Sequence, residues 1–210
     1  MTAVVERFST GPVNTNAYIL ACSKSSEGVI IDPAPGSTKQ LVQGSASIKI
    51  RAILITHSHW DHIADLKKVK DIFDVPVYIH SQDKQNIVNP GSDNVFTPLK
   101  IEGLTPEKYF EDNMTLAVGF LNLKIISTPG HSPGSVCIYL EKEKILFSGD
   151  TLFKGSIGVL SLPTSSPESM WESLKILERL PPETTVYPGH GPATTIGDEN
   201  WLKDAKKLFG

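Results

Sequence analysis

Thr56-His57-Ser58-His59-Trp60-Asp61-His62 places three histidines and one aspartate within six residues, in the pattern H-x-H-x-D-H. The apolar run before it, residues 52–55, is typical of a buried strand. Residues 61–73 after it carry apolar side chains at helical spacing, so we expect a helix there. The histidines therefore lie where a buried strand gives way to a helix, and open α/β folds bind ligands at that end of their strands.

Three other junctions between a predicted strand and a turn also carry a histidine or an aspartate. They are Thr128-Pro129-Gly130-His131, Phe147-Ser148-Gly149-Asp150 and Tyr187-Pro188-Gly189-His190. Glycine allows tight or left-handed turns, which lets the next side chain be aimed at a common point. A polar loop whose imidazoles only form hydrogen bonds is the alternative. This alternative does not explain why three of the six histidines fall in one loop. A metal site does explain it, because neutral imidazole is the commonest metal ligand.

These motifs together resemble the metallo-β-lactamase superfamily, and within it most closely the glyoxalase II (hydroxyacylglutathione hydrolase) branch. The resemblance rests on H-x-H-x-D-H, on Gly130-His131-Ser132-Pro133-Gly134-Ser135, on Gly149-Asp150-Thr151-Leu152-Phe153 and on Pro188-Gly189-His190-Gly191-Pro192. Residues 11–18 and 30–33 resemble that branch as well. The resemblance implies an α+β fold, the four-layer αββα sandwich of this superfamily, in a single domain over residues 1–210. It places the site along one edge of the two sheets.

The same resemblance implies two divalent metal ions. His57, His59 and His131 would hold the first metal. Asp61, His62 and His190 would hold the second, and Asp150 would bridge the two. Asp61 and Asp150 are therefore the expected catalytic residues, although Asp61 could instead orient a water or take a proton. Zinc is the expected metal, and iron or manganese suit the same ligands.

The ligand types indicate a metallohydrolase. A divalent metal lowers the pKa of its bound water from about 16 to about 7, so a metal-bound hydroxide at a dinuclear centre would attack a carbonyl carbon. A thiol leaving group with a pKa of about 8.5 departs as a thiolate without a strong general acid. The resemblance and this chemistry together favour hydrolysis of a small-molecule thioester.

Other activities stay open at this point. One is hydrolysis of a lactone, an ester or a phosphoester, and another is a persulfide dioxygenase with one iron held by His57, His131 and Asp150. A non-catalytic scaffold would have lost a ligand, and none is lost. We do not expect a true β-lactamase, because residues 1–11 contain no export signal and the common zinc type has cysteine where this chain has Asp150.

Two departures from glyoxalase II concern the substrate. We expect a short form, because the sequence ends about 20 residues after His190, where glyoxalase II continues into a helical domain that holds glutathione. In that branch a basic residue that helps bind the glutathione carboxylate follows a glycine. Here Gly158 is followed by Val159, which cannot pair with a carboxylate. Lys154 is the nearby candidate for a substitute.

Composition limits the partners and the location. The net charge of −3 and the pI of about 6.1 give no basic patch, so we expect no nucleic-acid partner. No apolar run approaches the length of a membrane span, so we expect no membrane partner and a cytoplasmic protein. Cys22 and Cys137 lie in apolar runs and are expected to be buried small hydrophobes. His80 is expected to be an ordinary strand-end histidine. Trp60 is expected to pack against the site, and the alternative is that it lines the substrate path.

The rest of the sequence predicts short strands and a few helices. Residues 81–113 read as a loop with a short helix near residues 82–88. Ser166-Pro167-Glu168 begins a helix, with serine as the cap and proline in the first turn. A last helix is expected from residue 197 to 208. The strands are expected in two groups, at residues 4–5, 17–21, 29–31, 53–55 and 75–79, and at residues 114–118, 121–127, 135–140 and 144–147.

Overall fold

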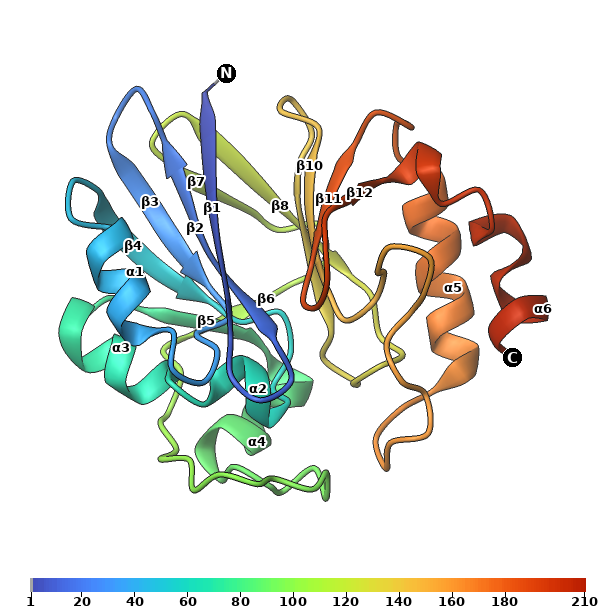
Figure 1. Ribbon diagram of the computed structural model, residues 1–210, viewed down its shortest axis with the longest axis horizontal. Coiled ribbons are helices and arrows are strands. Elements are labelled where there is room, and N and C mark those ends of the chain that lie inside the picture. The colour runs from blue at the N-terminus through green and yellow to red at the C-terminus, as the bar shows by residue number, and fades with distance from the viewer. Residues whose placement is uncertain (1) are drawn as a thin grey trace.

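The computed structural model describes residues 2–210, and its strands form two six-stranded sheets (Figure 1). The first sheet has the order β1-β2-β3-β4-β5-β6, with strands Ala3–Thr10, Thr15–Cys22, Glu27–Ile31, Lys49–Leu54, Val77–His80 and Lys108–Phe110. The second sheet has the order β12-β11-β10-β9-β8-β7. Its strands are β7 (Thr115–Val118), β8 (Leu121–Ser127), β9 (Val136–Leu140), β10 (Ile145–Gly149), β11 (Thr185–Pro188) and β12 (Thr194–Thr195). Both sheets mix parallel and antiparallel pairs.

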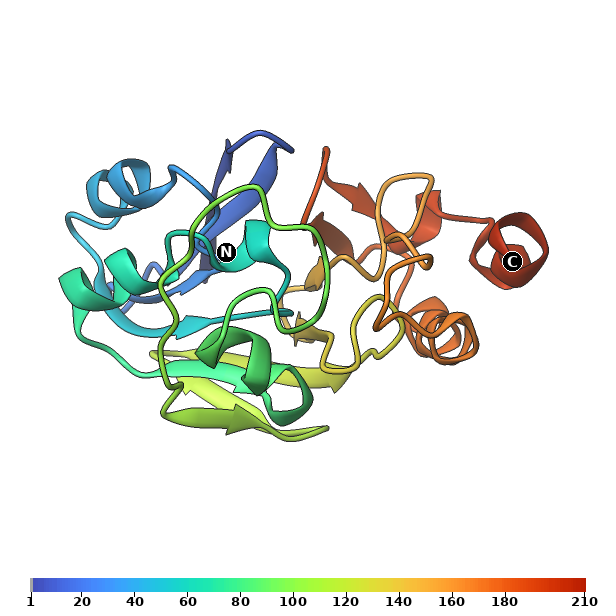
Figure 2. The same cartoon turned by 90° about the horizontal axis from the view of Figure 1, so that it is seen from below.

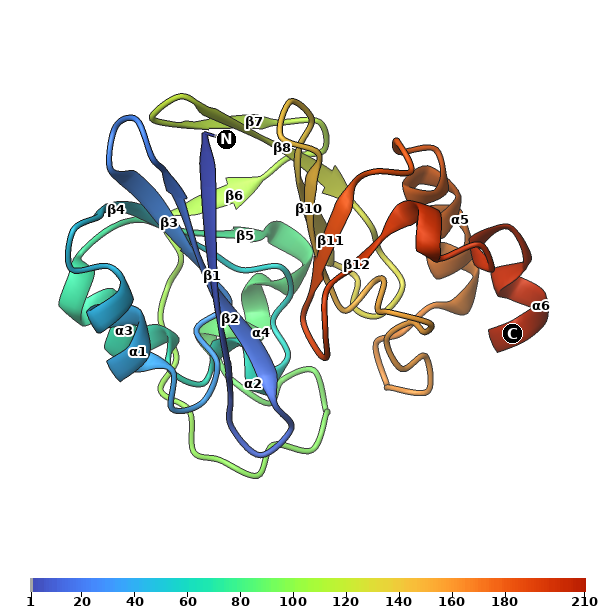
Figure 3. The same cartoon turned by 45° about the horizontal axis from the view of Figure 1, so that its top comes forward.

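The two sheets pack face to face, with helices on both outer sides. Side chains such as Leu20 and Leu54 of the first sheet share a buried cluster with Ile125 and Ile138 of the second. The helices α1 (Thr38–Gly44) and α3 (Leu66–Phe73) cover the outer face of the first sheet. The helix α5 (Pro167–Glu178) covers the second, and α6 (Ala205–Phe209) lies beside it. Figures 1 and 3 show these four layers side by side, which confirms the αββα sandwich.

Burial on both faces explains the composition of the central strands. Every residue of β2 is buried, because the sandwich core covers one face and α1 the other. A strand in this position reads as a continuous apolar run instead of an alternating one. The prediction of buried strands before the histidine motif and before Asp150 is therefore confirmed by β4 and β10.

The predicted helix at residues 61–73 is wrong as a single element. The chain forms α2 (Trp60–Ile63) and then α3, with Asp65 between them at φ −100° and ψ 5°. The Asp65 carboxylate accepts hydrogen bonds from the Thr38 backbone N–H at 3.1 Å and from its hydroxyl at 2.7 Å. This bond to α1 fixes Asp65 outside helical geometry. Ile72, expected on the apolar face, is half exposed.

The predicted helix at residues 197–208 is also wrong. Two 3₁₀ turns, Ile196–Asp198 and Leu202–Asp204, precede α6. Glu199 lies between them and is buried, where its carboxylate accepts from Thr194, Trp201 and the Gly155 N–H. Because the buried Glu199 carboxylate is bound by three partners, the chain around it cannot continue as one helix.

Other predicted elements agree with the structure. Ser166 caps α5 by accepting from the Ser169 N–H at 3.3 Å, as the Ser-Pro-Glu pattern predicts. Residues 81–113 contain a 3₁₀ turn (Ser81–Asp83) and α4 (Lys84–Val88), and also the short strand β6, which the sequence did not suggest. Among residues 2–210, none of the helices has both the length and the apolar character that crossing a membrane requires.

Candidate metal centre

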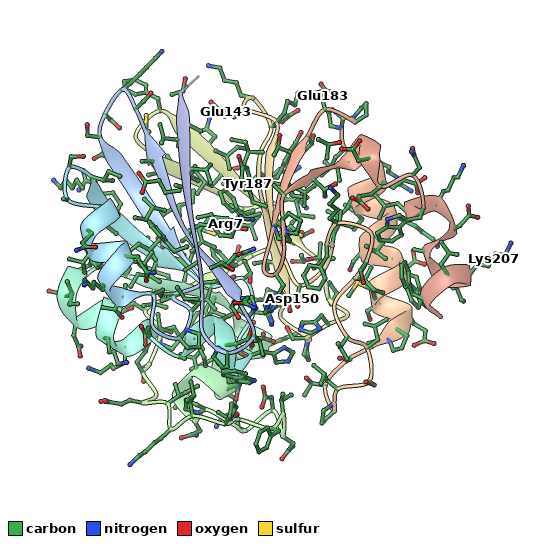
Figure 4. All side chains as sticks on the ribbon, viewed as in Figure 1. Arg7, Glu143, Asp150, Glu183, Tyr187 and Lys207 are labelled. Carbon is green, nitrogen blue, oxygen red and sulfur yellow. The ribbon has the colours of Figure 1, made fainter. Side chains whose placement is uncertain are left out.

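The four predicted junctions meet at one edge of the sandwich. His57 and His59 follow β4, and Asp61 and His62 lie on α2. His131 follows β8, Asp150 follows β10, and His190 follows β11. In the second sheet β8 and β10 are both antiparallel to β9, and β10 is parallel to β11, so their carboxyl ends reach the same edge. Figure 4 shows Asp150 at this edge, between the two sheets, and Figure 2 views the molecule from that side.

All seven predicted residues lie close enough together to share metal ions. Three groups have their nitrogen or oxygen atoms within 4.8 Å of one another: His57 with His59 and His131, His57 with His62 and Asp150, and Asp61 with His62 and His190. The first and third groups are the two ligand sets that the family resemblance implies. The geometry is thus compatible with both sets, and the roles of the residues as ligands stay a prediction.

Asp150 lies between the two predicted ligand sets. Its Oδ1 is 3.3 Å from His62 Nε2. Its Oδ2 is 3.4 Å from His131 Nε2 and 3.4 Å from His190 Nε2. One carboxylate thus faces histidines of both sets, as a bridging residue must.

Unpartnered buried atoms test whether the residues fit a metal. His57 Nε2, His62 Nε2 and Asp150 Oδ1 are buried and have no hydrogen-bond partner among the described residues, although the last two lie 3.3 Å apart as an ion pair. Buried polar atoms are normally paired, and leaving one unpaired costs about 1–3 kcal/mol. Because these three atoms belong to one of the groups above, a cation between them would satisfy all of them. The donor set of imidazoles and carboxylates therefore fits a divalent metal.

Four of the five histidines in the centre are held by their other ring nitrogen. His62 Nδ1 donates to Asp32 at 2.9 Å, His131 Nδ1 to the Val159 carbonyl at 2.9 Å, and His190 Nδ1 to the Val13 carbonyl at 3.2 Å. His57 Nδ1 lies 3.2 Å from the Thr56 hydroxyl. Such bonds fix the ring orientation and leave Nε2 free to bind a metal. In His59 it is Nδ1 that faces the centre, 2.8 Å from His131 Nε2.

Three supporting residues were not assigned a role from the sequence. Asp32 accepts from the Thr56 N–H at 2.8 Å, from the Thr56 hydroxyl at 2.6 Å and from His62, so it holds the histidine motif at both ends. Asp32 lies directly after the apolar residues 29–31, as the predicted ligands lie after their strands, so the same pattern could have identified Asp32 from the sequence. Thr15 donates to Asp61 Oδ2 at 2.6 Å, and it lies in the segment 11–18 that resembles the glyoxalase II branch, although no role was assigned to it there.

Asp83 is the third supporting residue and connects two of the ligand loops. Its carboxylate accepts from the Ser58 N–H at 2.8 Å, from the Ser132 hydroxyl at 2.8 Å and from the Gly134 N–H at 2.7 Å. Ser58 lies between His57 and His59, and Ser132 follows His131. Asp83 is buried, so it fixes these loops relative to each other away from solvent.

Burial and the buried charges of the centre shift the pKa values of its histidines in opposite directions. Burial lowers the pKa of His57 well below its usual range, and burial with the nearby His131 lowers the pKa of His59 to about 3. Burial acts to raise the pKa of Asp150, but His62 and His190 outweigh it and hold this pKa well below its usual range. Burial acts to lower the pKa of His62 and of His190, but the nearby aspartates outweigh it, so that the pKa of His62 lies well above its usual range and the pKa of His190 is raised to about 9. Metals bind neutral imidazole and ionised carboxylate, so a metal that binds here would displace protons from His62 and His190.

Two glycines make room for the centre. A Cβ on Gly189 would lie 2.7 Å from His62 Cε1 and closer still to Asp150 Oδ1. A Cβ on Gly158 would lie 2.8 Å from His131 Nδ1 and would collide with the Asp150 carbonyl. Both contacts are shorter than the 3.5–4.0 Å that carbon atoms prefer, so these positions require glycine for close approach.

A pocket of about 220 Å³ opens onto the centre. Five predicted ligands line it together with five apolar residues, which are Val13, Trp60, Val95, Val159 and Leu162. Of the two roles considered for Trp60, the pocket favours the second, because its side chain forms part of the wall. Lys154 is exposed and is not among the residues that line this pocket.

The residues predicted to lie outside the site do so. His80 is half-buried at the end of β5, where its ring nitrogen accepts from the Gln82 N–H at 3.4 Å. Cys22 and Cys137 are both buried and unpaired, as small hydrophobes. Burial raises the pKa of the Cys137 thiol to about 11, which removes it as a nucleophile at neutral pH.

Comparison with known families and relatives agrees with the geometry. The family model described as the metallo-beta-lactamase superfamily matches residues 10–190. The chain is 33% identical over 195 residues to the probable metallo-hydrolase YqgX of Bacillus subtilis (strain 168), which covers 90% of this chain and 91% of that protein. It is also 32% identical over 163 residues to a hydroxyacylglutathione hydrolase of Francisella philomiragia, over 77% of this chain and 58% of that protein.

Solved structures show the same architecture. The crystal structure of BLEG-1 B3 metallo-beta-lactamase superposes with a TM-score of 0.87 and 36% identity, over 99% of this chain and 100% of that one. The crystal structure of TTHA1623 in a di-iron-bound form gives a TM-score of 0.78 and 35% identity, over 92% of this chain and 96% of that one. Both likenesses extend over nearly the whole chain.

Proposed function

The chain belongs to the metallo-β-lactamase superfamily, and we propose that it is a metal-dependent hydrolase that cleaves thioesters at the seven-residue centre. One observation carries the metal dependence. Seven histidines and aspartates from both halves of the fold converge, and several of their inward atoms are buried without a partner among the described residues. Metal ions held there would supply a hydroxide at neutral pH and would polarise the substrate carbonyl.

The residues of the chain hold and orient this centre. Asp150 faces histidines of both ligand sets, and Asp61 is oriented by the Thr15 hydroxyl. Asp61 Oδ2 also lies 3.1 Å from His190 Nε2. These fixed positions reduce the reorganisation that the reaction requires, which is the main contribution of a preorganised site.

The pocket wall supports a thiol as the leaving group. Apart from the predicted ligands, the side chains that line the pocket in residues 2–210 are all apolar, so none of them can donate a proton to the leaving group. A thiol with a pKa of about 8.5 departs as a thiolate, whereas an alkoxide needs a proton. The hydroxyacylglutathione hydrolase of Francisella philomiragia supports the same reaction class over the part of the chain that it matches.

Hydrolysis of β-lactams is the second candidate. The likeness to BLEG-1 B3 metallo-beta-lactamase, at 36% identity over the full length of that chain, favours it against the expectation from the sequence. The ring strain of a β-lactam also helps its nitrogen to leave without an acid. The two reactions share the attack on a carbonyl carbon, so only substrates can separate them.

The first experiment is the metal content of the protein purified without added metal, measured by elemental analysis. About two divalent ions per chain would support the dinuclear hydrolase. The di-iron form of TTHA1623 makes iron a candidate beside zinc. One iron per chain, with oxygen consumption on addition of a persulfide, would refute hydrolysis in favour of the dioxygenase.

The second experiment compares substrate classes on the metal-loaded protein. Thioester cleavage is followed by release of free thiol, and β-lactam cleavage by loss of the ring absorbance. Chelated protein and the Asp150→Ala variant serve as controls. Turnover of thioesters with little turnover of β-lactams would support the proposal, and the reverse order would replace it with the second candidate.

A further inference from the structure

We propose that Glu199, which lies outside the metal centre, is a positioning residue for His190 and thereby sets the metal affinity of the second predicted ligand set. The proposal rests on the metal dependence of the proposed function and goes beyond it by giving the C-terminal segment a role in that site. It follows from the exposure of His190, from the ring that packs against it and from the bonds that Glu199 forms.

His190 is the least enclosed residue of the centre. The other six are buried, whereas 26% of the His190 side chain is exposed. Its Nε2 faces Asp61 Oδ2 at 3.1 Å and Asp150 Oδ2 at 3.4 Å, so binding of a metal by the second set depends on where this ring points. The Val13 carbonyl accepts from Nδ1 at 3.2 Å. A single hydrogen bond allows the ring to tilt about it, so packing against the ring decides its orientation.

The Phe153 ring provides that packing. The centroids of the Phe153 and His190 rings are 5.8 Å apart and their planes meet at 86°, which is an edge-to-face arrangement that aromatic pairs favour. Phe153 begins a tight turn that ends at Ser156, and two backbone hydrogen bonds of 2.8 Å and 3.3 Å between these residues close it. The position of the Phe153 ring therefore depends on how this turn is held.

Glu199 holds the turn from the C-terminal segment. Its Oε2 accepts from the Gly155 N–H at 2.7 Å, and in the part of the chain that the structure describes this is the one hydrogen bond from the turn to a distant segment. Its Oε1 accepts from the Thr194 hydroxyl on β12, which lies next to β11 (Figure 1) and begins four residues after His190. The Trp201 indole N–H donates to Oε2 as well. One carboxylate thus joins the strand that follows His190 to the turn that packs on its ring.

Burial makes this carboxylate hard to replace. Glu199 is only 3% exposed, and a buried carboxylate is unfavourable unless donors surround it. Three donors do so here, and without the acceptor they would be left unpaired. The turn would then have to move for the Gly155 N–H to reach water, and this movement would carry the Phe153 ring away from His190.

The first predicted ligand set has separate support. His57 and His59 follow β4, and His131 Nδ1 donates to the Val159 carbonyl, which lies beyond the turn. Loss of the Glu199 carboxylate should therefore weaken metal binding by the second set and spare the first. A residue that only stabilised the fold would weaken both sets alike.

The test titrates chelator-treated protein with Co²⁺, followed by calorimetry and by the visible absorption of the bound ion. The binding step that disappears in His190→Ala belongs to the second set. Glu199→Met keeps the length of the side chain and removes its acceptors, so we expect the affinity of that step to fall by about tenfold while the other step is unchanged. Glu199→Gln should retain most of the affinity, because its oxygen can still accept from the Gly155 N–H.

Two further variants identify the cause. Phe153→Ala should give the same selective loss, and combining it with Glu199→Met should add little, because Glu199 acts through the ring. Asp198→Asn removes a negative charge from an exposed neighbour and should bind both ions as the wild type does.

Each result has a separate meaning. Equal losses at both steps, an equal loss in Glu199→Gln and Glu199→Met, or fully additive losses in the double variant would overturn the positioning role and leave the metal centre in place. Unchanged affinity in Phe153→Ala would also overturn it, and this variant decides if Glu199→Met does not fold. A wild type that binds one Co²⁺ per chain would remove the inference, and one that binds none would remove the proposed function as well.

Discussion

Replacing Gly189 by alanine tests the geometry of the centre more directly than removing a ligand. The added Cβ would lie 2.7 Å from His62 Cε1 and closer to Asp150 Oδ1, whereas carbon atoms prefer a separation of about 3.5 Å. The loop or the two side chains must therefore move by about 1 Å. A displacement of that size at a reacting site costs about 10²-fold in rate, so we expect kcat/KM to fall by about 10²-fold and metal affinity to fall with it.

A neighbouring glycine provides the matched control. Gly191 lies in the same loop at φ +75°, and a Cβ there would meet nothing within 4 Å. Gly191→Ala thus adds backbone strain of about 1–2 kcal/mol without intruding on the centre. We expect a lower free energy of unfolding but unchanged metal content and kcat/KM. Full metal content and wild-type activity in Gly189→Ala would refute the argument, as would equal losses of activity in the two variants.

Three further perturbations follow from single contacts. Asp150→Ala should lower kcat/KM by more than about 100-fold, which is the largest loss usual for residues that only support a metal ligand. The metal content should fall as well, while the circular dichroism spectrum stays unchanged. Unchanged activity would rule out the bridging role. Asp83→Asn should weaken metal binding by about tenfold, because its amide cannot accept all three bonds that join the His59 and His131 loops, and competition with a chelator measures this. Burial acts to raise the pKa of Asp65, but hydrogen bonds from Thr38 and Lys68 outweigh it and lower this pKa below its ordinary value. The ionised Asp65 therefore stabilises the fold above the unfolded pKa of about 3.9, and this contribution is lost as the pH falls through the lower folded value. Asp65→Asn should thus cost about 1–2 kcal/mol at pH 7, with the difference from wild type disappearing in acid; a difference that is constant with pH in urea titrations would contradict this.

The seven residues of the centre were accessible to sequence reasoning because His131, Asp150 and His190 each follow a predicted strand at a turn, and the other four belong to one motif that also follows a predicted strand. Apolar runs before His57, His131, Asp150 and His190 place these residues at strand ends, and the fold brings those ends to one edge. This pattern depends only on the local sequence and on a rule of sheet geometry, so it can be recognised without knowing the contacts between distant segments. Asp32 follows the same rule and could have been included.

The remaining features depend on contacts between distant segments. Asp65 divides the predicted helix because its carboxylate bonds Thr38, 27 residues earlier. Asp83 joins loops that lie 25 and 49 residues away from it. Val95 forms part of the pocket wall although it stands in a polar stretch, where a single valine has no periodicity to mark it. The roles of these residues depend on tertiary contacts, and no local sequence pattern indicates them.

The separation of the candidate ligands along the chain has a thermodynamic consequence. His57 and His190 are 133 residues apart (190 minus 57), and the first comes from the first sheet while the second comes from the other. A cation that joins the two sets ties the halves of the sandwich as a reversible cross-link. A covalent cross-link that closes a loop of about 100 residues stabilises a fold by about 4–5 kcal/mol in the chain-entropy model. Metal binding at the centre would therefore stabilise the fold reversibly, and the melting temperature would rise with the fraction of centres that hold metal.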